Sequence, residues 1–202
     1  MIRPAGVGDL PAILAIYGPY VTHTTCSFEY TVPTPAEFLA RFQAITAQFP
    51  WLVWEEMGEV LGYAYGSAPF ERAAYRWCAE VSIYLRPDAR GRGIGRKLYA
   101  VLEELLRLQG YRTIYSIITE ENQASLDFHR ALGYKFMCRM ADCGFKFGRW
   151  IGVIWLEKPL FSGKIPSNSP LPWPTLVKND RIFHEILANL SLSKSQKIWY
   201  VM

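Results

Sequence analysis

Arg90-Gly91-Arg92-Gly93-Ile94-Gly95 is the stretch that decides the fold of this 202-residue chain. Three glycines within five residues leave backbone N–H groups accessible to an anion, because no side chain blocks the approach. The residues that follow have helical periodicity, with an apolar stripe that ends near Gly110. A helix start adds about half a positive charge. Together with Arg90, Arg92 and Arg96, the stretch therefore indicates a pyrophosphate site.

Two common phosphate motifs do not fit this stretch. A dinucleotide fingerprint requires Gly-x-Gly-x-x-Gly, whereas here Gly93 is followed two residues later by Gly95 and position 96 is Arg. A nucleotide P-loop requires Gly-Lys-Ser/Thr, which is absent. One alternative stays open, namely a glycine-rich connection whose arginines are only solvated.

The segments on both sides of the stretch alternate between helical and strand patterns. Helices are expected from Asp9-Leu10-Pro11, with Asp9 as the cap, and after Pro33-Thr34-Pro35. Strand patterns before the stretch cover 51–54, 60–65 and about Tyr75 to Leu85. After it come a strand at 113–119, a short helix after Asn122, and strands near 134–141 and 149–157. This order predicts a mixed α/β (α+β) domain.

The last forty residues differ from the rest. The segment 162–170 reads as a linker, and the apolar residues between Ile182 and Leu190 predict one amphipathic helix. We therefore expect a catalytic domain at residues 1–161 and an extension at 162–202. A dispensable tail is the alternative.

Composition limits the classes of partner. Half of the residues are hydrophobic and 20% are charged, which is the balance of a folded globular protein. The net charge is +4, and the basic residues are scattered except around 86–97. This pattern favours a local anion site over a nucleic-acid face. With no membrane-length apolar run and no signal peptide, we expect a cytoplasmic protein without membrane contact. The four cysteines lack metal-site spacing, so we expect reduced thiols and no metal.

Glu80 is the first candidate for proton transfer. It lies in the centre of a strand pattern among Trp77, Val81 and Ile83, where partial desolvation would raise the pKa of a carboxyl toward the range of a general base. A structural hydrogen-bond acceptor within the strand is the alternative.

The sequence resembles the GNAT N-acetyltransferase superfamily, whose cofactor motif is Gln/Arg-x-x-Gly-x-Gly/Ala. Arg90, Gly93 and Gly95 match it position by position. The resemblance narrows to the phosphinothricin and methionine sulfone acetyltransferase-like branch. It is carried by the segments Ser27–Glu29, Gly62–Ala64, Glu80–Leu85, Leu132–Tyr134 and Lys146–Trp150, and covers residues 2 to about 160.

The resemblance implies a GNAT fold, with a mostly antiparallel central sheet flanked by helices and a splayed strand pair that binds acetyl-CoA. The residues it implies for the cofactor are Ile83, Tyr84, Leu85, Arg90, Gly91, Arg92, Gly93, Ile94, Gly95, Arg96, Asn122 and Ser125. For Asn122, a helix N-cap is an equally good interpretation.

The same resemblance implies the roles at the reacting centre. It makes Glu80 the general base, and gives His129 an assisting role such as returning a proton to the coenzyme A thiolate. Many relatives have a tyrosine near that sulfur, so the identity of the acid stays open. For the acceptor it implies Phe28, Glu29, Ala73, Ala74 and Tyr75.

The implied function is direct acetyl transfer from acetyl-CoA to the primary amine of a small amino-acid-like molecule. Two alternatives remain, namely acetylation of protein N-termini or lysines, and a non-catalytic acetyl-CoA-binding regulatory module. The expected partners are a small-molecule amine and no nucleic acid, and a homodimer is left open because relatives are often dimers.

Overall fold

A seven-stranded sheet forms the centre of the computed structural model, which describes all residues except 162–167, 178–182, 184 and 189–202. The strand order is β1-β2-β3-β4-β5-β7-β6. Their bounds are β1 Ile2–Pro4, β2 Trp51–Glu56, β3 Glu59–Ser67, β4 Cys78–Leu85, β5 Thr113–Thr119, β6 Lys135–Lys146 and β7 Arg149–Pro159. All neighbours are antiparallel except β4 and β5. The predicted sheet is confirmed.

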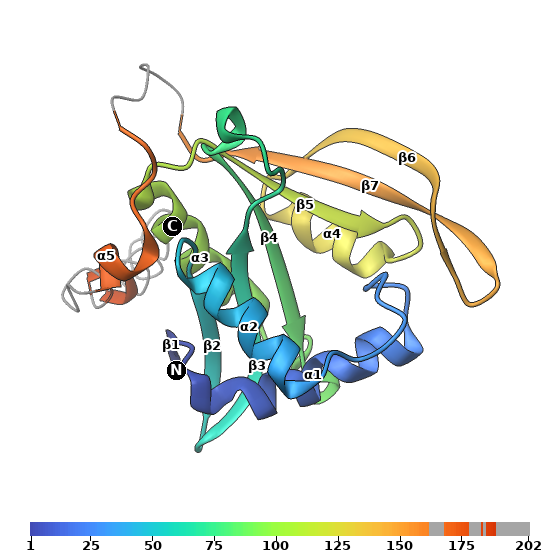
Figure 1. Ribbon diagram of the computed structural model, residues 1–202, viewed down its shortest axis with the longest axis horizontal. Helices are drawn as coiled ribbons and strands as arrows, with labels where there is room; N and C mark the ends of the chain where they lie inside the picture. Colours follow the sequence, from blue (N-terminus) through green and yellow to red (C-terminus); the bar gives the residue numbers. More distant parts are fainter. Residues whose placement is uncertain (162–167, 178–182, 184, 189–202) are drawn as a thin grey trace, which may run out of the picture.

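Helices cover both faces of this sheet (Figure 1). The helices are α1 Leu10–His23, α2 Pro35–Thr46, α3 Ile94–Gln109 and α4 Gln123–Ala131. Residues of α1 and α2 pack on one face of β2 and β3, around Trp51 and Tyr63. The apolar stripe of α3 packs on the other face, against Leu52, Ala64 and Val81. The period of two along each strand separates these two cores.

Local sequence signals account for most helix ends. Thr34 and Glu37 form a capping box at the start of α2, with the Glu37 N–H donating to Thr34 Oγ1 over 3.3 Å. Gly110 ends α3 in the left-handed region, as predicted. The prediction for Asp9 is wrong in detail, because its carboxylate accepts from the Arg3 guanidinium and the Gly6 N–H and makes no cap bond to α1.

Two further differences concern strands. The third predicted strand begins only at Cys78, because Ala73–Tyr75 forms a turn of 3₁₀ helix. The strand β1 was not predicted, since three residues are too short for a periodicity signal; it is held by pairing with β2.

The described part of the C-terminal segment packs on the core. Helix α5, Trp173–Val177, buries Trp173 and Leu176 in the cluster beside α3. The Trp173 N–H donates to Gln48 O over 3.1 Å, and Gln109 Nε2 donates to Gln48 O and Leu171 O over 2.8 and 2.7 Å. Most of the predicted linker lies outside the described residues. Of the predicted later helix, Phe183 and 185–188 are helical.

We expect Trp173→Ala to lower the free energy of unfolding by roughly 3–5 kcal/mol, because a buried indole is replaced by a cavity. Leu171→Ala is the matched control. Its side chain is 45% exposed, so a loss below about 1 kcal/mol is expected. Urea unfolding followed by circular dichroism measures both. Equal midpoints for the two variants would show that α5 contributes no stability.

Candidate active site

Strands β4 and β5 separate along their length. They pair in parallel only from Cys78–Glu80 to Thr113–Tyr115, although β4 continues to Leu85 and β5 to Thr119. Beyond Glu80 the facing backbone groups have no ladder partner across the gap. A cleft of about 490 Å³ opens there. The predicted splayed pair is therefore present, and Ile83, Tyr84 and Leu85 line the cleft.

The glycine-rich stretch closes one end of this cleft. Gly91 and Gly93 have φ of 72° and 76°, a left-handed backbone that other residues adopt only with strain. Gly93 is also the N-cap of α3, and no side chain caps the helix. The first N–H groups of α3 are thus accessible for an anion, at the positive end of the helix dipole.

Two of the three arginines in and beside the stretch contribute to the cleft. Arg90 and Arg96 line it. The Arg90 side chain is held by Tyr20 of α1, whose hydroxyl accepts from Arg90 Nη2 over 2.9 Å and whose ring lies 5.3 Å from the guanidinium. The same hydroxyl donates to Leu85 O over 2.6 Å. Tyr20 therefore connects α1, the end of β4 and the anion site.

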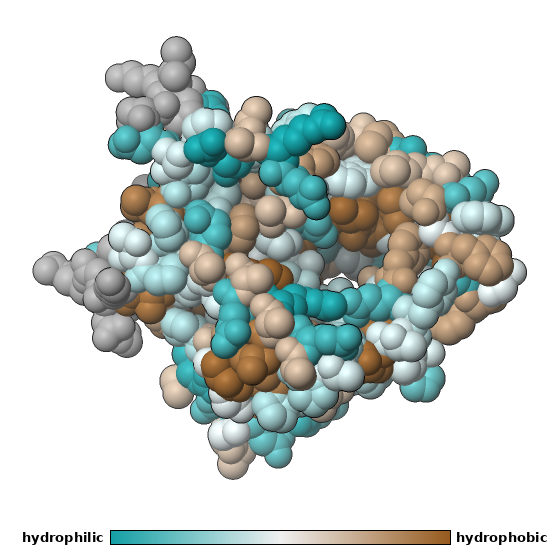
Figure 2. All heavy atoms as spheres, viewed as in Figure 1, coloured by the Kyte–Doolittle hydropathy of each residue, from teal (hydrophilic) through white to brown (hydrophobic). Residues whose placement is uncertain are grey.

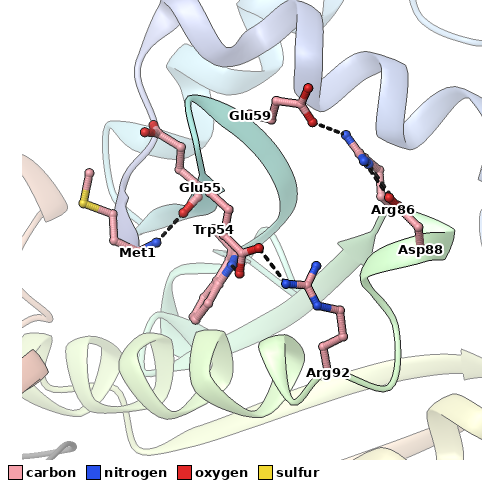
Figure 3. A network of polar contacts seen from close by, with 8 residues as sticks. Met1, Trp54, Glu55, Glu59, Arg86, Asp88 and Arg92 are labelled. Atoms are coloured by element: carbon pink, nitrogen blue, oxygen red, sulfur yellow. Dashed lines mark hydrogen bonds and ion pairs between the residues drawn. The ribbon is translucent and has the colours of Figure 1, made fainter.

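Arg92 lies apart from Arg90 and Arg96. It is not among the residues that line the cleft, and its Nη2 donates to Glu56 Oε2 over 2.6 Å. Figure 3 shows Arg92 reaching toward the β2–β3 hairpin. Pairing with Arg92 lowers the pKa of Glu56.

Glu80 stands at the closed end of the splay. Its strand neighbours Ala79 and Val81 are buried beneath α3, so Glu80 faces the opposite side of the sheet, two residues before the cleft-lining Ser82. Its pairing partners are Ser67 of β3 and Tyr115 of β5. Burial raises the pKa of Glu80 to about 7. The structure thus provides a carboxyl whose pKa suits proton abstraction near neutral pH.

His129 lies in the inner wall of the cleft, on α4. Its side chain is buried; Nε2 lies 2.9 Å from Ser116 Oγ and 3.1 Å from the Tyr99 hydroxyl, and Nδ1 lies 2.8 Å from Ser125 O. Only a protonated Nδ1 can donate to that carbonyl, so Nε2 is the acceptor. Burial lowers the pKa of His129 to about 4. The ring is therefore neutral near pH 7, and it has no cationic proton to give to a thiolate.

We expect the imidazole of His129 to stay neutral from about pH 5 to 9. A folded pKa near 4 means that protonation begins only below that range. Imidazole ¹⁵N chemical shifts, measured across the pH series, should show one fixed Nδ1–H tautomer for His129. The exposed His23 serves as the control. A His129 titration midpoint near 6.5 would contradict this.

Asn122 is both a helix cap and a residue of the cleft wall. It is the N-cap of α4, accepting from the Ser125 N–H over 3.2 Å, and with Ser125 it also lines the cleft. Its Nδ2 donates to Cys26 Sγ over 3.2 Å. Cys26 belongs to the segment 24–30 between α1 and α2, which we call the acceptor loop.

The residues expected at the acceptor lie outside the cofactor cleft. Phe28 and Glu29 are in the acceptor loop, and the Glu29 carboxylate is occupied by Arg41 and by the Tyr17 hydroxyl. Tyr75 is 46% exposed, 4.6 Å from the ring of Phe70. In Figure 2 a hollow, bordered by hydrophobic residues on one side and by hydrophilic residues on the other, lies between the acceptor loop and strands β5 and β7.

Comparison with known families shows which family of proteins has this fold and cleft. Residues 2–155 match the model of the acetyltransferase (GNAT) domain. The chain belongs to the GNAT acetyltransferase family. It is accordingly an acetyl-CoA-dependent N-acyltransferase, and acetyl-CoA is its cosubstrate.

Two similar proteins of the GNAT family act on phosphinothricin or on methionine sulfoximine and sulfone, according to their names. The phosphinothricin N-acetyltransferase of Alcaligenes faecalis is 41% identical over 166 residues, covering 80% of this chain and 83% of that protein. The L-methionine sulfoximine/L-methionine sulfone acetyltransferase of Pseudomonas aeruginosa is 42% identical over 160 residues, covering 77% and 92%. The structure of a phosphinothricin acetyltransferase from Sinorhizobium meliloti with acetyl-CoA has a TM-score of 0.81 at 38% identity, covering 86% and 96%.

Several residues of the GNAT cleft were not predicted. They are Tyr20, Thr24, Cys26, Val81, Ser82, Tyr99, Ser116, Ile117, Ile118, Thr119, Ala124 and Phe128. Ser116 to Thr119 could have been expected, because a splayed pair exposes both of its strands. Tyr20, Thr24 and Cys26 carried no signal, since α1 and its following loop reach the cleft only through tertiary packing.

None of the described helices is long and apolar enough to cross a membrane.

Proposed function

We propose that this GNAT enzyme acetylates the primary amine of a small amino-acid-like substrate of the phosphinothricin, methionine sulfone or methionine sulfoximine type. The named relatives support the substrate class. The observation that carries the reaction type is Glu80, a half-buried carboxyl with a pKa of about 7, at the point where the pairing of β4 and β5 ends. A pKa near the working pH is what a general base requires.

For the donor, we assign the pyrophosphate of acetyl-CoA to Arg90, Gly91, Gly93, Ile94, Gly95 and Arg96. The pantetheine arm is assigned to the free edge of β4 at Ile83, Tyr84 and Leu85, with Asn122 and Ser125 across the cleft. An extended chain can bond to unpaired strand groups as an added strand does. Arg92 is left out of this set because Glu56 occupies its guanidinium.

In the proposed reaction, Glu80 takes a proton from the substrate ammonium group. The free amine nitrogen then attacks the thioester carbonyl carbon, and the C–S bond breaks. The thiolate of coenzyme A takes up the second proton that the nitrogen loses, and Glu80 releases the first proton to solvent. No acyl-enzyme forms. His129 serves as a neutral hydrogen-bond acceptor that orients the hydroxyls of Ser116 and Tyr99.

For the acceptor, we propose the hollow between the acceptor loop and strands β5 and β7 (Figure 2), with the turn at Ala73, Ala74 and Tyr75 as a further part of the site. Phe28 and Tyr75 supply exposed ring surface there. Glu29 acts through Arg41 and Tyr17, because both partners already bind its carboxylate.

An acceptor screen tests this function. Thiol release from acetyl-CoA is followed with phosphinothricin, methionine sulfone, methionine sulfoximine, a peptide with a free N-terminus, and no amine. Release only with the three small amines supports the proposal. A second candidate function is acetylation of protein N-termini. It is favoured by the similarity to a ribosomal-protein-alanine N-acetyltransferase from Brucella melitensis, whose structure has a TM-score of 0.77 at 34% identity. A preference for the peptide over the small amines would support this second function. Acetyl-CoA binding without release would indicate a regulatory module.

We further propose a cytoplasmic homodimer without metal or nucleic-acid partners. The hairpin β6–β7 carries exposed apolar side chains, among them Phe136, Phe147 and Trp150 at 61, 55 and 62% exposure. The four cysteines are free thiols, in keeping with a reducing compartment. Residues 1–161 would form the catalytic domain and 162–202 an extension of it. Sedimentation equilibrium tests the dimer, which a Trp150→Ser variant should weaken.

A further inference from the structure

Lys146 is the last residue of β6 and is buried, with only 2% of its surface exposed. Its ammonium donates three hydrogen bonds, all to backbone carbonyls: Val21 O at 2.7 Å, Thr24 O at 2.9 Å and Ser27 O at 2.6 Å. An ammonium group has three donors, so its capacity is filled. No carboxylate within the described part of the chain forms a salt bridge with it.

The three carbonyls belong to one place in the fold, namely the end of α1 and the acceptor loop. The last four carbonyls of a helix lack partners within it and carry its negative partial charge. Val21 is one of these, since α1 ends at His23. The ammonium thus binds carbonyls that would otherwise be buried without a donor, and it fixes the path of the loop relative to α1.

The tip of the hairpin brings Lys146 to this position. Lys146 pairs with Arg149, so only Phe147 and Gly148 form the turn, and both have positive φ, of 52° and 75°. A two-residue turn of this kind fixes the register of the two strands. The hairpin therefore presents the ammonium at a set point beside the loop.

Two other contacts join the same hairpin to the acceptor loop. The ring of Phe28 packs on the backbone of Gly144, where an added Cβ would lie 2.2 Å from Phe28 Cε2. The Tyr30 hydroxyl donates to Phe145 O over 2.6 Å. On its other side the loop reaches the cofactor cleft, which Thr24 and Cys26 line. The loop is thus a wall between the two substrates, held from outside by β6–β7.

We propose that Lys146 is a positioning residue for the acceptor. By binding three carbonyls of the α1 end and the acceptor loop, it sets where Phe28 stands, with Gly144 providing the space for the ring. This role rests on the proposed function, because Phe28 is taken as part of the acceptor site. The consequence is an effect on acceptor binding that leaves the binding of acetyl-CoA unchanged.

Steady-state kinetics of Lys146→Met, Lys146→Arg and Gly144→Ala test this role, with Lys135→Met, an exposed lysine of the same strand, as control. We expect the KM for the acceptor to rise about tenfold or more in Lys146→Met and Gly144→Ala, with the KM for acetyl-CoA within about twofold of the wild type. Lys146→Arg keeps the charge and donors, and should fall between wild type and Lys146→Met. Lys135→Met should match the wild type.

Hydrogen exchange measured on the same variants separates this role from the proposed function. Amides of residues 24–30 should exchange faster in Lys146→Met and Gly144→Ala, while those of α3 stay protected. If the wild type acetylates no amine, the proposed function fails, and the exchange data still decide whether the hairpin holds the loop. Equal rises in both KM values, or unchanged acceptor KM in a folded Gly144→Ala variant, would overturn the role of Lys146. Should Lys146→Met not fold, Gly144→Ala decides alone.

Discussion

Replacing Glu80 by glutamine is expected to lower kcat by about 10²–10⁴-fold, the contribution of a positioned base. Glutamine keeps the size of the side chain but cannot take a proton from the acceptor. The affinity for acetyl-CoA should stay near that of the wild type, because the carboxyl faces the closed end of the splay and does not line the cofactor cleft. Stopped assays of thiol release and calorimetric titration of acetyl-CoA measure the two quantities.

The pH dependence sharpens this test. The base must be ionised, and burial raises the pKa of Glu80 from 4.5 to about 7, so kcat/KM of the wild type should rise with pH through about 7 and then level off. In Glu80→Gln this rise should be absent. Glu104→Gln, on the outer side of α3 and ion-paired with Arg107, is the control and should keep the wild-type profile. A Glu80→Gln enzyme with the same profile would remove Glu80 as the base.

Stability provides an independent readout of the same carboxyl. A folded pKa raised above the unfolded value stabilises the fold below about pH 4.5, and that contribution is lost as the pH rises through about 7. Glu80→Gln has no charge to bury. As the pH rises from about 4.5 to 7, its free energy of unfolding should therefore increase relative to that of the wild type. Urea unfolding at each pH measures this difference.

The second large effect is expected on the donor side. Gly93→Val should weaken acetyl-CoA binding by about ten- to a hundredfold, for two reasons. Gly93 has φ of 76°, which is a strained backbone for a β-branched residue, and a side chain at the N-cap of α3 would occupy the space of the anion. Calorimetric titration of the folded variant with acetyl-CoA gives the affinity directly.

Gly58→Val separates strain from the loss of the anion site. Gly58 has φ of 82° and lies in the β2–β3 turn, away from the cleft. It should lose a similar amount of stability and keep the affinity for acetyl-CoA. If both variants bind acetyl-CoA like the wild type, the glycine-rich stretch is not the pyrophosphate site. Gly93→Val and Glu80→Gln thus report on donor binding and on chemistry separately.

The features that the sequence predicted correctly depend on neighbours along the chain. Gly110 ends α3 in the left-handed region, and β4, the glycine-rich stretch and α3 follow one another along the chain. Backbone conformation, helix caps and the direction of the helix dipole are local properties. For this reason the fold class could be predicted from a stretch of six residues and its flanks, and the resemblance carried by that stretch implied the donor. The anion site itself stays a prediction.

Side-chain surroundings required the tertiary structure. Arg92 and Arg90 are two residues apart, yet one binds Glu56 and the other binds Tyr20. His129 resembles a proton donor in the sequence, but burial keeps it neutral near pH 7. Glu29 was expected to face the substrate, and it binds Arg41. Partners and burial come from segments that are distant in the sequence, so no periodicity could show them.

The sequence by itself predicted a glycine-rich stretch between a strand and a helix, and its resemblance to the GNAT family implied acetyl-CoA as the donor. Only the tertiary structure decided the state of the groups around it: the raised pKa of Glu80, the neutral ring of His129 and the three carbonyls on Lys146. The physical reason is that a backbone site is built from consecutive residues, whereas desolvation and hydrogen bonding at a side chain depend on what folding brings beside it.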